Sequence, residues 1–216
     1  MRILVVSATT AEIQPLAAAA RSHEDHHVDV LVTGVGMLAT AVRTTRALLQ
    51  SRYDFAVNLG LCGSFDPALP RGTVVHVVSD QMPELGAEDE SSFLTIQELG
   101  LLSPDEPPFV DGCLVNTAPP QNAVLDDLPA VRGVTVNTAH GDAASIAALL
   151  ARLRPAPQVE SMEGAAFMYA CLVHGIPFAQ VRAVSNVVEH RNRVAWQIPE
   201  ALSALQRVAM DLLASL

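Results

Sequence analysis

Positive charge is scarce in this sequence. The 216 residues include 13 Lys and Arg against 23 Asp and Glu, which gives a formal net charge of −10 at neutral pH. Nucleic acids and anionic membranes attract positively charged surfaces, so this balance argues against either as a partner. The chain also lacks any apolar run near the roughly 20 residues that span a bilayer. Neither nucleic acid nor membrane is therefore expected to bind.

Cysteines and aromatic residues are also few. Cys62, Cys113 and Cys171 lie far apart, which does not suggest a disulfide framework and fits a reducing cytoplasm. The N-terminal segment has no basic region followed by an extended apolar region, so it predicts a first strand and not a secretion signal. Only 4% of the residues are aromatic although 50% are hydrophobic. Ala, Val and Leu are therefore expected to fill the core.

Short apolar runs alternate with helical patterns along the chain. Strands are expected at 2–7, 28–32, 55–58, 73–79 and 131–137, and a C-terminal helix at 198–213. This alternation predicts an α/β fold: a single domain, 1–216, with a central mixed, largely parallel twisted sheet flanked by helices. The acidic, proline-containing stretch 80–108 is expected to be irregular and to lie on the surface.

The segment 159–188 predicts a strand, an apolar helix covered on every side, and a second strand. Ser161 is a candidate N-cap and Gly175 is expected to end the helix. Glu163, in the first helical turn, could simply be an anion stabilised by the helix dipole. Asn186, however, is expected at the same carboxyl edge of the sheet, where α/β folds bind ligands. The two residues together indicate a binding site.

Glu12 follows the first strand in a similar way, in the first turn of a helix, where compensation of the helix dipole is the simplest role. Glycine-containing turns at 34–36 and 60–63 follow the second and third strands and indicate close approach of the backbone to another group. Cys62 in the second turn is expected to be packed and not nucleophilic, because no partnered His or Asn is evident nearby.

The seven histidines show no spacing typical of a metal site. His23, His26 and His27 cluster on a polar connection, where a solvated loop is the simpler interpretation. No metal and no other cofactor is expected.

These motifs, in this order, resemble the purine nucleoside phosphorylase/nucleosidase superfamily. The segments SMEGAA and VRAVSN carry the resemblance in the C-terminal half, and GAEDESSF and SNVVEHRNRVAW are similar to the futalosine hydrolases within that superfamily. The resemblance covers nearly the whole chain and implies the superfamily's fold.

The resemblance also implies roles for individual residues. Glu12 matches the glutamate that activates water in nucleosidases, and Met162 and Glu163 match the pair whose glutamate binds the ribose 2′- and 3′-hydroxyls. Gly60 belongs to a glycine-rich loop around the ribosyl site. Trp196 falls where relatives place an aromatic ring over the pocket.

The chain departs from its relatives at several positions. Asn186 stands where adenine-specific nucleosidases have an aspartate; an amide cannot act as an acid but can donate toward N7 and a 6-oxo oxygen, which favours hypoxanthine. Ala144 replaces an aromatic residue that stacks on adenine. Asn58 stands where phosphorylases carry an arginine for phosphate, so water is the expected nucleophile, although Arg43 could restore a cation.

The expected activity is hydrolysis of the N-glycosidic bond of futalosine to release hypoxanthine, as in menaquinone biosynthesis. A nucleosidase or phosphorylase for another 6-oxopurine nucleoside, or a non-catalytic nucleoside-binding protein on the same fold, are the alternatives. Retention of Glu12 and Glu163 argues against the last of these.

Three further expectations concern the assembly of the protein and its arginine residues. Relatives complete their pockets across a dimer interface, so at least a homodimer is expected, with Phe93 contributed by the neighbour. Arg191 and Arg193 are candidates to bind the carboxylate of futalosine's benzoate-bearing chain. Arg182 lies inside a buried strand and is expected to pair with a carboxylate such as Glu160.

Overall fold

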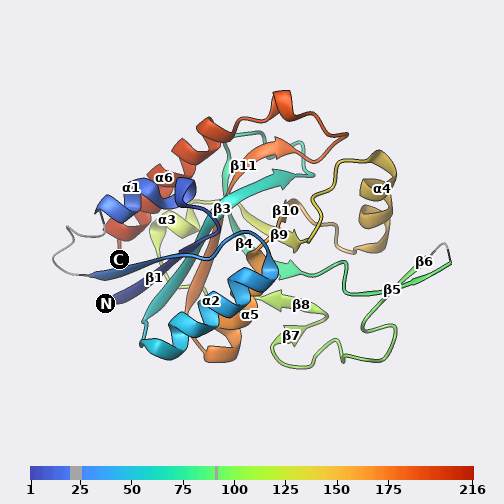
Figure 1. The fold of residues 1–216 in the computed structure, drawn as a ribbon, viewed down its shortest axis with the longest axis horizontal. Coiled ribbons are helices and arrows are strands. Elements are labelled where there is room, and N and C mark those ends of the chain that lie inside the picture. The colour runs from blue at the N-terminus through green and yellow to red at the C-terminus, as the bar shows by residue number, and fades with distance from the viewer. Residues whose placement is uncertain (20–25, 91) are drawn as a thin grey trace.

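The computed structural model describes residues 1–19, 26–90 and 92–216, and within them nine strands form one sheet (Figure 1). The order across the sheet is β2 (His27–Val32), β1 (Arg2–Ser7), β3 (Phe55–Ser64), β10 (Val159–Ser161), β9 (Ala130–Thr135), β4 (Val74–Gln81), β8 (Cys113–Val115) and β7 (Phe109–Val110).

The ninth strand, β11 (Phe178–Val187), closes the middle of this sheet on itself. It pairs in parallel with β3 along its length and antiparallel with β4 at residues 181–183. Strands β3, β10, β9, β4 and β11 thus form a closed ring, from which β1 and β2 extend on one side and β8 and β7 on the other. The predicted α/β class with a mixed, largely parallel sheet is confirmed, and closure is the feature that the strand pattern did not predict.

Helices cover the sheet on two faces (Figure 1). On one face, α1 (Thr10–Ala19), α3 (Ala123–Asp126) and α6 (Ile198–Ala214) lie together, and α6 packs its buried residues against β3 and β11. On the other, α2 (Met37–Gln50) packs against α5 (Gly164–His174). Helix α4 (Ala143–Arg152) stands at the far end of the molecule, and a single 3-10 turn, η1 (Arg193–Ala195), precedes α6. No helix in the described part of the chain is both long and apolar enough to cross a membrane.

Helix α5 differs in part from the expectation of complete cover. Most of its residues are buried, and Gly175 ends it with a φ of 64°, as predicted. Tyr169 and Val173, however, remain exposed. The apolar composition of this helix therefore predicted more burial than one chain provides.

The stretch 80–108 is mostly turns, as expected, but it also contains a hairpin. Strands β5 (Gly86–Asp89) and β6 (Ser92–Thr95) pair antiparallel and project from the body of the molecule (Figure 1). Their largely polar, exposed sequence gives no alternation of buried and exposed residues. The expectation of an irregular, surface-lying stretch was therefore wrong for this hairpin and for Asp80, which is buried in β4.

A buried carboxyl group joins β4, β9, β11 and α5. Asp80 accepts hydrogen bonds from Thr135 Oγ1 at 2.9 Å and from Gln180 Nε2 at 3.0 Å. Thr135 Oγ1 in turn accepts from the backbone N–H of Ala165 at 2.7 Å. Burial raises the pKa of the Asp80 carboxyl to about 6, and these hydrogen bonds only partly offset the effect. Gln180 Oε1 is buried and has no hydrogen-bond partner in the part of the chain that the structure describes.

This carboxyl predicts a pH dependence of stability. Its folded pKa is above its usual value near 3.9, so the folded protein holds a proton that the unfolded chain releases between roughly pH 4 and 6. The free energy of unfolding should therefore fall as pH rises through this window, by about 3 kcal/mol from this group. The Asp80→Asn variant removes the titration, and its amide could donate to Gln180 Oε1.

Denaturant unfolding from pH 4 to pH 7 tests this prediction. The stability of Asp80→Asn relative to the original protein should rise across the window, whereas that of Asp211→Asn, at an exposed aspartate of α6, should not. If the difference in unfolding free energy between Asp80→Asn and the original protein does not change with pH, the raised pKa of Asp80 is contradicted.

Candidate active site

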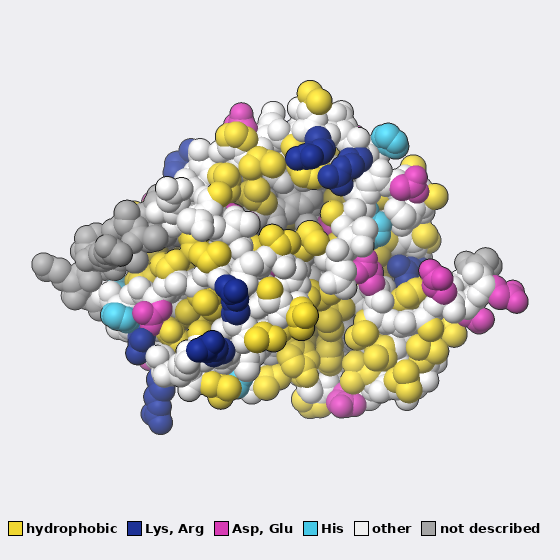
Figure 2. Space-filling view, viewed as in Figure 1, with side chains coloured by type: hydrophobic (Ala, Val, Ile, Leu, Met, Phe, Trp, Pro, Cys, Tyr) yellow, Lys and Arg dark blue, Asp and Glu magenta, His cyan; other side chains and the backbone are white. Residues whose placement is uncertain are grey.

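A cavity of about 440 Å³ opens where β1, β3, β10 and β11 end. Figure 2 shows the molecule hollowed on this face, with positively charged side chains at the rim. Five of the six residues singled out in the sequence line the cavity: Glu12, Met162, Glu163, Asn186 and Trp196. They come from four separate stretches of the chain, so the fold assembles the site.

Glu12 is buried and its two oxygens face different groups. Oε2 accepts hydrogen bonds from Ser7 Oγ at 2.7 Å, from the Thr9 N–H at 2.8 Å and from Thr9 Oγ1 at 2.9 Å. The contact with the Thr9 N–H closes the first turn of α1, which is the helix-stabilising role that the sequence suggested. Among the described residues, Oε1 accepts a hydrogen bond from the Leu61 N–H alone, at 3.3 Å, and Glu12 lines the cavity. One carboxylate oxygen is thus available to a ligand or a water molecule.

Glu163 occupies the N-cap position of α5, but its side chain does not cap that helix. Its Oε1 instead accepts from the Gly36 N–H at 2.9 Å. Gly36 has a φ of 96°, which strongly favours glycine, so the 34–36 turn is shaped to present this N–H. The contact fixes the carboxylate at the cavity, so stabilisation by the dipole of α5 is not the whole role of Glu163.

Gly60 lies below the cavity and does not line it. A Cβ on Gly60 would come within 2.3 Å of Arg182 Nη1 and 3.4 Å of Glu12 Oε1. The absence of a side chain therefore makes room for the Arg182 guanidinium beneath Glu12. Arg182 is only 1% exposed, and its Nη2 donates to Asn58 Oδ1. The expected pairing of Arg182 with Glu160 was wrong, because Glu160 binds His140 instead.

Cys62, next to Arg182, has the inert character that the sequence indicated. Burial raises the pKa of its thiol to about 12, and the charge of Arg182 lowers it only in part. Because the thiolate is the reactive form of cysteine, this thiol is a poor nucleophile.

Asn186 reaches the cavity through an irregularity in β11. The pairing register with β3 shifts between Val184 and Asn186, which turns the chain at this point. Asn186 Oδ1 accepts from Ser185 Oγ at 2.9 Å, and Nδ2 donates to the Val187 carbonyl at 3.0 Å. A side-chain amide has two N–H donors, so one remains for a ligand.

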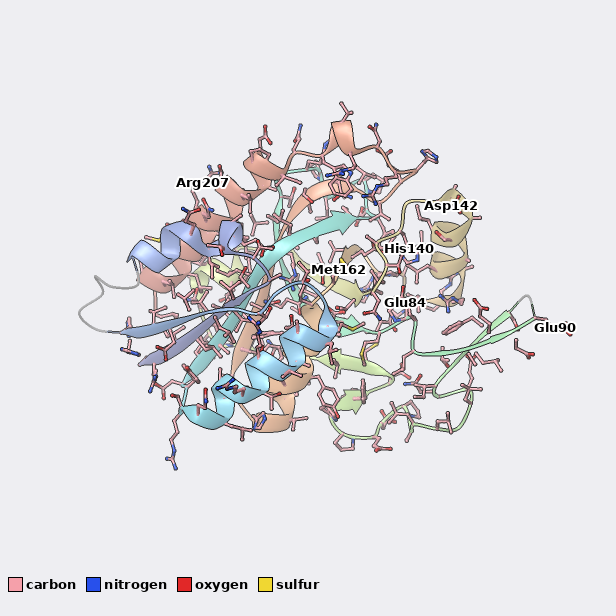
Figure 3. All side chains as sticks on the ribbon, viewed as in Figure 1. Glu84, Glu90, His140, Asp142, Met162 and Arg207 are labelled. Carbon is pink, nitrogen blue, oxygen red and sulfur yellow. The ribbon has the colours of Figure 1, made fainter. Side chains whose placement is uncertain are left out.

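The cavity also contains a pair that was not among the predicted site residues. His140 Nδ1 forms a hydrogen bond with Glu160 Oε2, and the His140 backbone N–H donates to Glu160 Oε1 at 2.9 Å. Burial raises the pKa of the Glu160 carboxyl, which the hydrogen bonds from His140 partly offset. Figure 3 shows His140 between Met162 and Asp142, toward α4. A carboxylate inside the apolar strand β10 was the sequence signal that could have identified this pair.

The positive charges are distributed differently from the expectations. Arg43 donates to the Val32 carbonyl at 3.0 Å and does not line the cavity, and neither does Arg193. Arg191 does line it, and its guanidinium lies 5.6 Å from the centre of the Trp196 ring. Ala144 is outside the cavity, where Asp142 caps α4.

No group of three or more His, Cys, Asp or Glu in the described ranges is placed to hold a metal ion. Of the histidine cluster that precedes β2, His23 lies outside the described residues, and His27 Nε2 lies 3.1 Å from Asp29 Oδ1.

Comparison with known proteins places this site in a family. Residues 3–214 match the model of the phosphorylase superfamily. A futalosine hydrolase of Streptomyces coelicolor is 38% identical over 184 residues, which cover 82% of this chain and 74% of that protein. The chain therefore belongs to the phosphorylase superfamily, in its futalosine hydrolase branch.

Other members of the branch and of the superfamily agree with this placement. A futalosine hydrolase of Acidothermus cellulolyticus is 31% identical over 94% of this chain and 86% of its own length. The structure of a Helicobacter pylori futalosine hydrolase superposes with a TM-score of 0.78 at 13% identity, covering 100% of this chain and 98% of that one. A Neisseria meningitidis 5′-methylthioadenosine/S-adenosylhomocysteine nucleosidase, in complex with methylthio-immucillin-A, gives 0.80 at 15% identity and covers 100% and 99%. These structures share the fold of this chain.

Proposed function

We propose that this chain hydrolyses the N-glycosidic bond of futalosine and releases hypoxanthine, as a step of menaquinone biosynthesis. The observation that carries the proposal is the pair of buried carboxylates, Glu12 and Glu163, that face one cavity in a relative of futalosine hydrolases. The three unpaired cysteines of the described chain are consistent with the cytoplasm as its location.

The two carboxylates have different tasks in this proposal. Glu12 Oε1 orients a water molecule and takes its proton as the water attacks the ribosyl carbon C1′. Glu163 accepts hydrogen bonds from the ribose 2′- and 3′-hydroxyls, and these bonds strengthen as positive charge develops on the sugar. The buried guanidinium of Arg182 lies beneath Glu12 and places a positive charge close to the proposed base.

In this proposal Asn186 recognises the purine base. Its remaining N–H can donate to N7 or to the 6-oxo oxygen of hypoxanthine, whereas an amide has no acidic proton to transfer. Hypoxanthine, a 6-oxopurine, is also a better leaving group than adenine, so the absence of an acid at position 186 is tolerated.

Water is favoured over phosphate as the nucleophile. Phosphate binding uses cationic donors, and Arg191 is the one Lys or Arg among the described residues that line the cavity. Purified protein should therefore release hypoxanthine from futalosine at the same rate with and without millimolar phosphate, as measured by chromatography. A ribose 1-phosphate product would overturn hydrolysis, and the absence of hypoxanthine would overturn futalosine as the substrate.

The roles of the glutamates predict that Glu12→Gln and Glu163→Gln each lose roughly 10²-fold or more in kcat. An amide at position 12 cannot take a proton from water, and at position 163 it presents a donor to the ribose hydroxyls. Glu106→Gln, at an exposed carboxyl that does not line the cavity, serves as the control and should keep its rate. Thermal unfolding checks that each variant folds, and a near-normal rate for Glu12→Gln would return that residue to a purely helix-stabilising role.

The protein also acts, in this proposal, as a homodimer. An exposed apolar surface, here called the α2–α5 face, consists of Leu38, Val42, Leu49, Tyr169 and Val173. In Figure 2 hydrophobic side chains gather over this part of the molecule. Val35, which is also exposed, lies at the start of α2 and lines the cavity, so the face is continuous with the site. Apolar patches of this kind are typical of protein interfaces.

The α2–α5 face predicts that Leu38→Glu converts a dimer to a monomer. Leu38 is 81% exposed in one chain, and a carboxylate there would be desolvated in an apolar interface. Val194→Glu, in η1 and 97% exposed, is the matched control. Light scattering after gel filtration gives the mass, and a wild-type monomer with full activity would contradict the proposal.

Phe93 was expected to be contributed to the pocket of a neighbouring subunit. In this structure it packs against Arg152 of its own chain, with the guanidinium 4.2 Å from the ring centre.

A further inference from the structure

The His140–Glu160 pair gives the cavity an ionisable group that the two glutamates do not account for. Both Glu160 oxygens are engaged by His140, one with the backbone N–H and one with ring Nδ1. Ring Nε2 makes no hydrogen bond to the described residues. His140 lines the main cavity and also a second hollow of about 420 Å³ beside α4, so this residue lies at the boundary between the two. The pair therefore leaves one imidazole nitrogen for a ligand.

A purely structural role does not explain the imidazole. The loop that carries His140 is already held by the Arg191 N–H, which donates to the Gly141 carbonyl at 3.0 Å. The Asn137 N–H also donates to Glu84 Oε2 at 2.8 Å. In addition, the His140 backbone N–H would bind Glu160 whatever the side chain. Burying a carboxylate costs free energy, and here it holds a ring whose Nε2 has no partner among the described residues.

The position of His140 defines what it would contact. Glu12 lies after β1 and His140 after β9, and β3 and β10 separate these strands in the sheet. Displacement at C1′ places the incoming water and the departing base on opposite sides of the carbon. If Glu12 marks the water, the base leaves toward the end of the cavity that holds His140, with Glu163 between them.

We propose that His140, oriented by Glu160, is the general acid that protonates the leaving purine. This inference rests on the proposed function. As the C1′–N9 bond breaks, its electron pair passes to the purine, and the protonated ring gives its Nε2 proton to an acceptor atom of the base. Water supplies the new C1′–O bond and gives a proton to Glu12. Exchange with solvent then returns the proton from Glu12 and reprotonates His140, so the sum is nucleoside plus water to ribosyl product plus base.

This role supplies what Asn186 cannot, because an amide has no proton to transfer at neutral pH. The charged residues that line the two cavities, besides Glu12, are Glu84, Asp142, Glu160, Glu163, Glu189 and Arg191.

The test is the pH dependence of kcat for futalosine in His140→Gln. Glutamine retains hydrogen-bonding ability but cannot donate a proton, so kcat should fall roughly 10²-fold. The alkaline decline in rate that comes from deprotonation of His140 should also disappear. His190→Gln, at an exposed histidine that lines neither cavity, should keep both rate and profile. A loss of rate with the alkaline decline retained, or no loss at all, would overturn the inference.

Glu160→Gln separates positioning from proton transfer. It removes the negative charge that stabilises the protonated ring, so the alkaline decline should move to lower pH while His140 still acts. An unchanged profile would show that Glu160 does not orient an acid.

Calorimetric binding of hypoxanthine provides a reading that needs no turnover. His140→Gln should bind the base about 5-fold more weakly, as expected for the loss of one hydrogen bond. If wild-type protein binds hypoxanthine through His140 but does not cleave futalosine, the proposed function fails and this contact stands. If wild-type protein cleaves futalosine and His140→Gln matches it in rate and affinity, this inference fails alone.

Discussion

The double pairing of β11 is the constraint on which the rest of the structure depends. By pairing with β3 on one side and β4 on the other, it brings the ends of β1, β3, β10 and β11 around one opening. An open sheet would spread these ends along a line. Closure also leaves β11 with two environments: Ala179, Val181 and Ala183 belong to the apolar core that α6 covers, while Gln180 and Arg182 meet buried polar groups.

That polar side of β11 links the interior to the site. Gln180 donates a hydrogen bond to Asp80, and Asp80 is linked through Thr135 to the N–H of Ala165 in the first turn of α5. A side chain at Gly164 would collide with Asp80 and Gln180, so a glycine is needed there. Arg182 lies under Glu12 through the space that Gly60 leaves. Buried polar groups of this kind cost free energy and fix a single arrangement, because few alternatives satisfy their hydrogen bonds. The positions of the carboxylates in the cavity are therefore fixed by the buried polar groups that β11 places beneath them.

Local pattern was sufficient to predict the main strands and helices and the residues at strand ends. Glu12, Glu163 and Asn186 were recognisable because polar residues follow apolar strands at the carboxyl edge. What the pattern could not supply depends on distant pairing. Arg182 meets Asn58 because β11 lies beside β3, which the sequence alone did not reveal. Glu160 and His140 likewise meet because β10 lies beside β9. The position of Gly60 below the cavity follows from the same packing, since a glycine has no side chain whose direction a sequence could indicate.

The carboxylates around the cavity are held by different means, and this difference suits the chemistry. Glu12 accepts three hydrogen bonds on one oxygen, Glu163 accepts one from the backbone N–H of Gly36 before α2, and Glu160 is bound by a histidine. Each is held by hydrogen bonds from the protein, so none has to reorganise when positive charge develops on a bound sugar. Pre-oriented charges of this kind stabilise a cation-like transition state more than the neutral ground state, because no energy is spent in turning them at the moment of reaction. An acidic cavity on this fold is therefore suited to breaking a glycosidic bond by forming a cation.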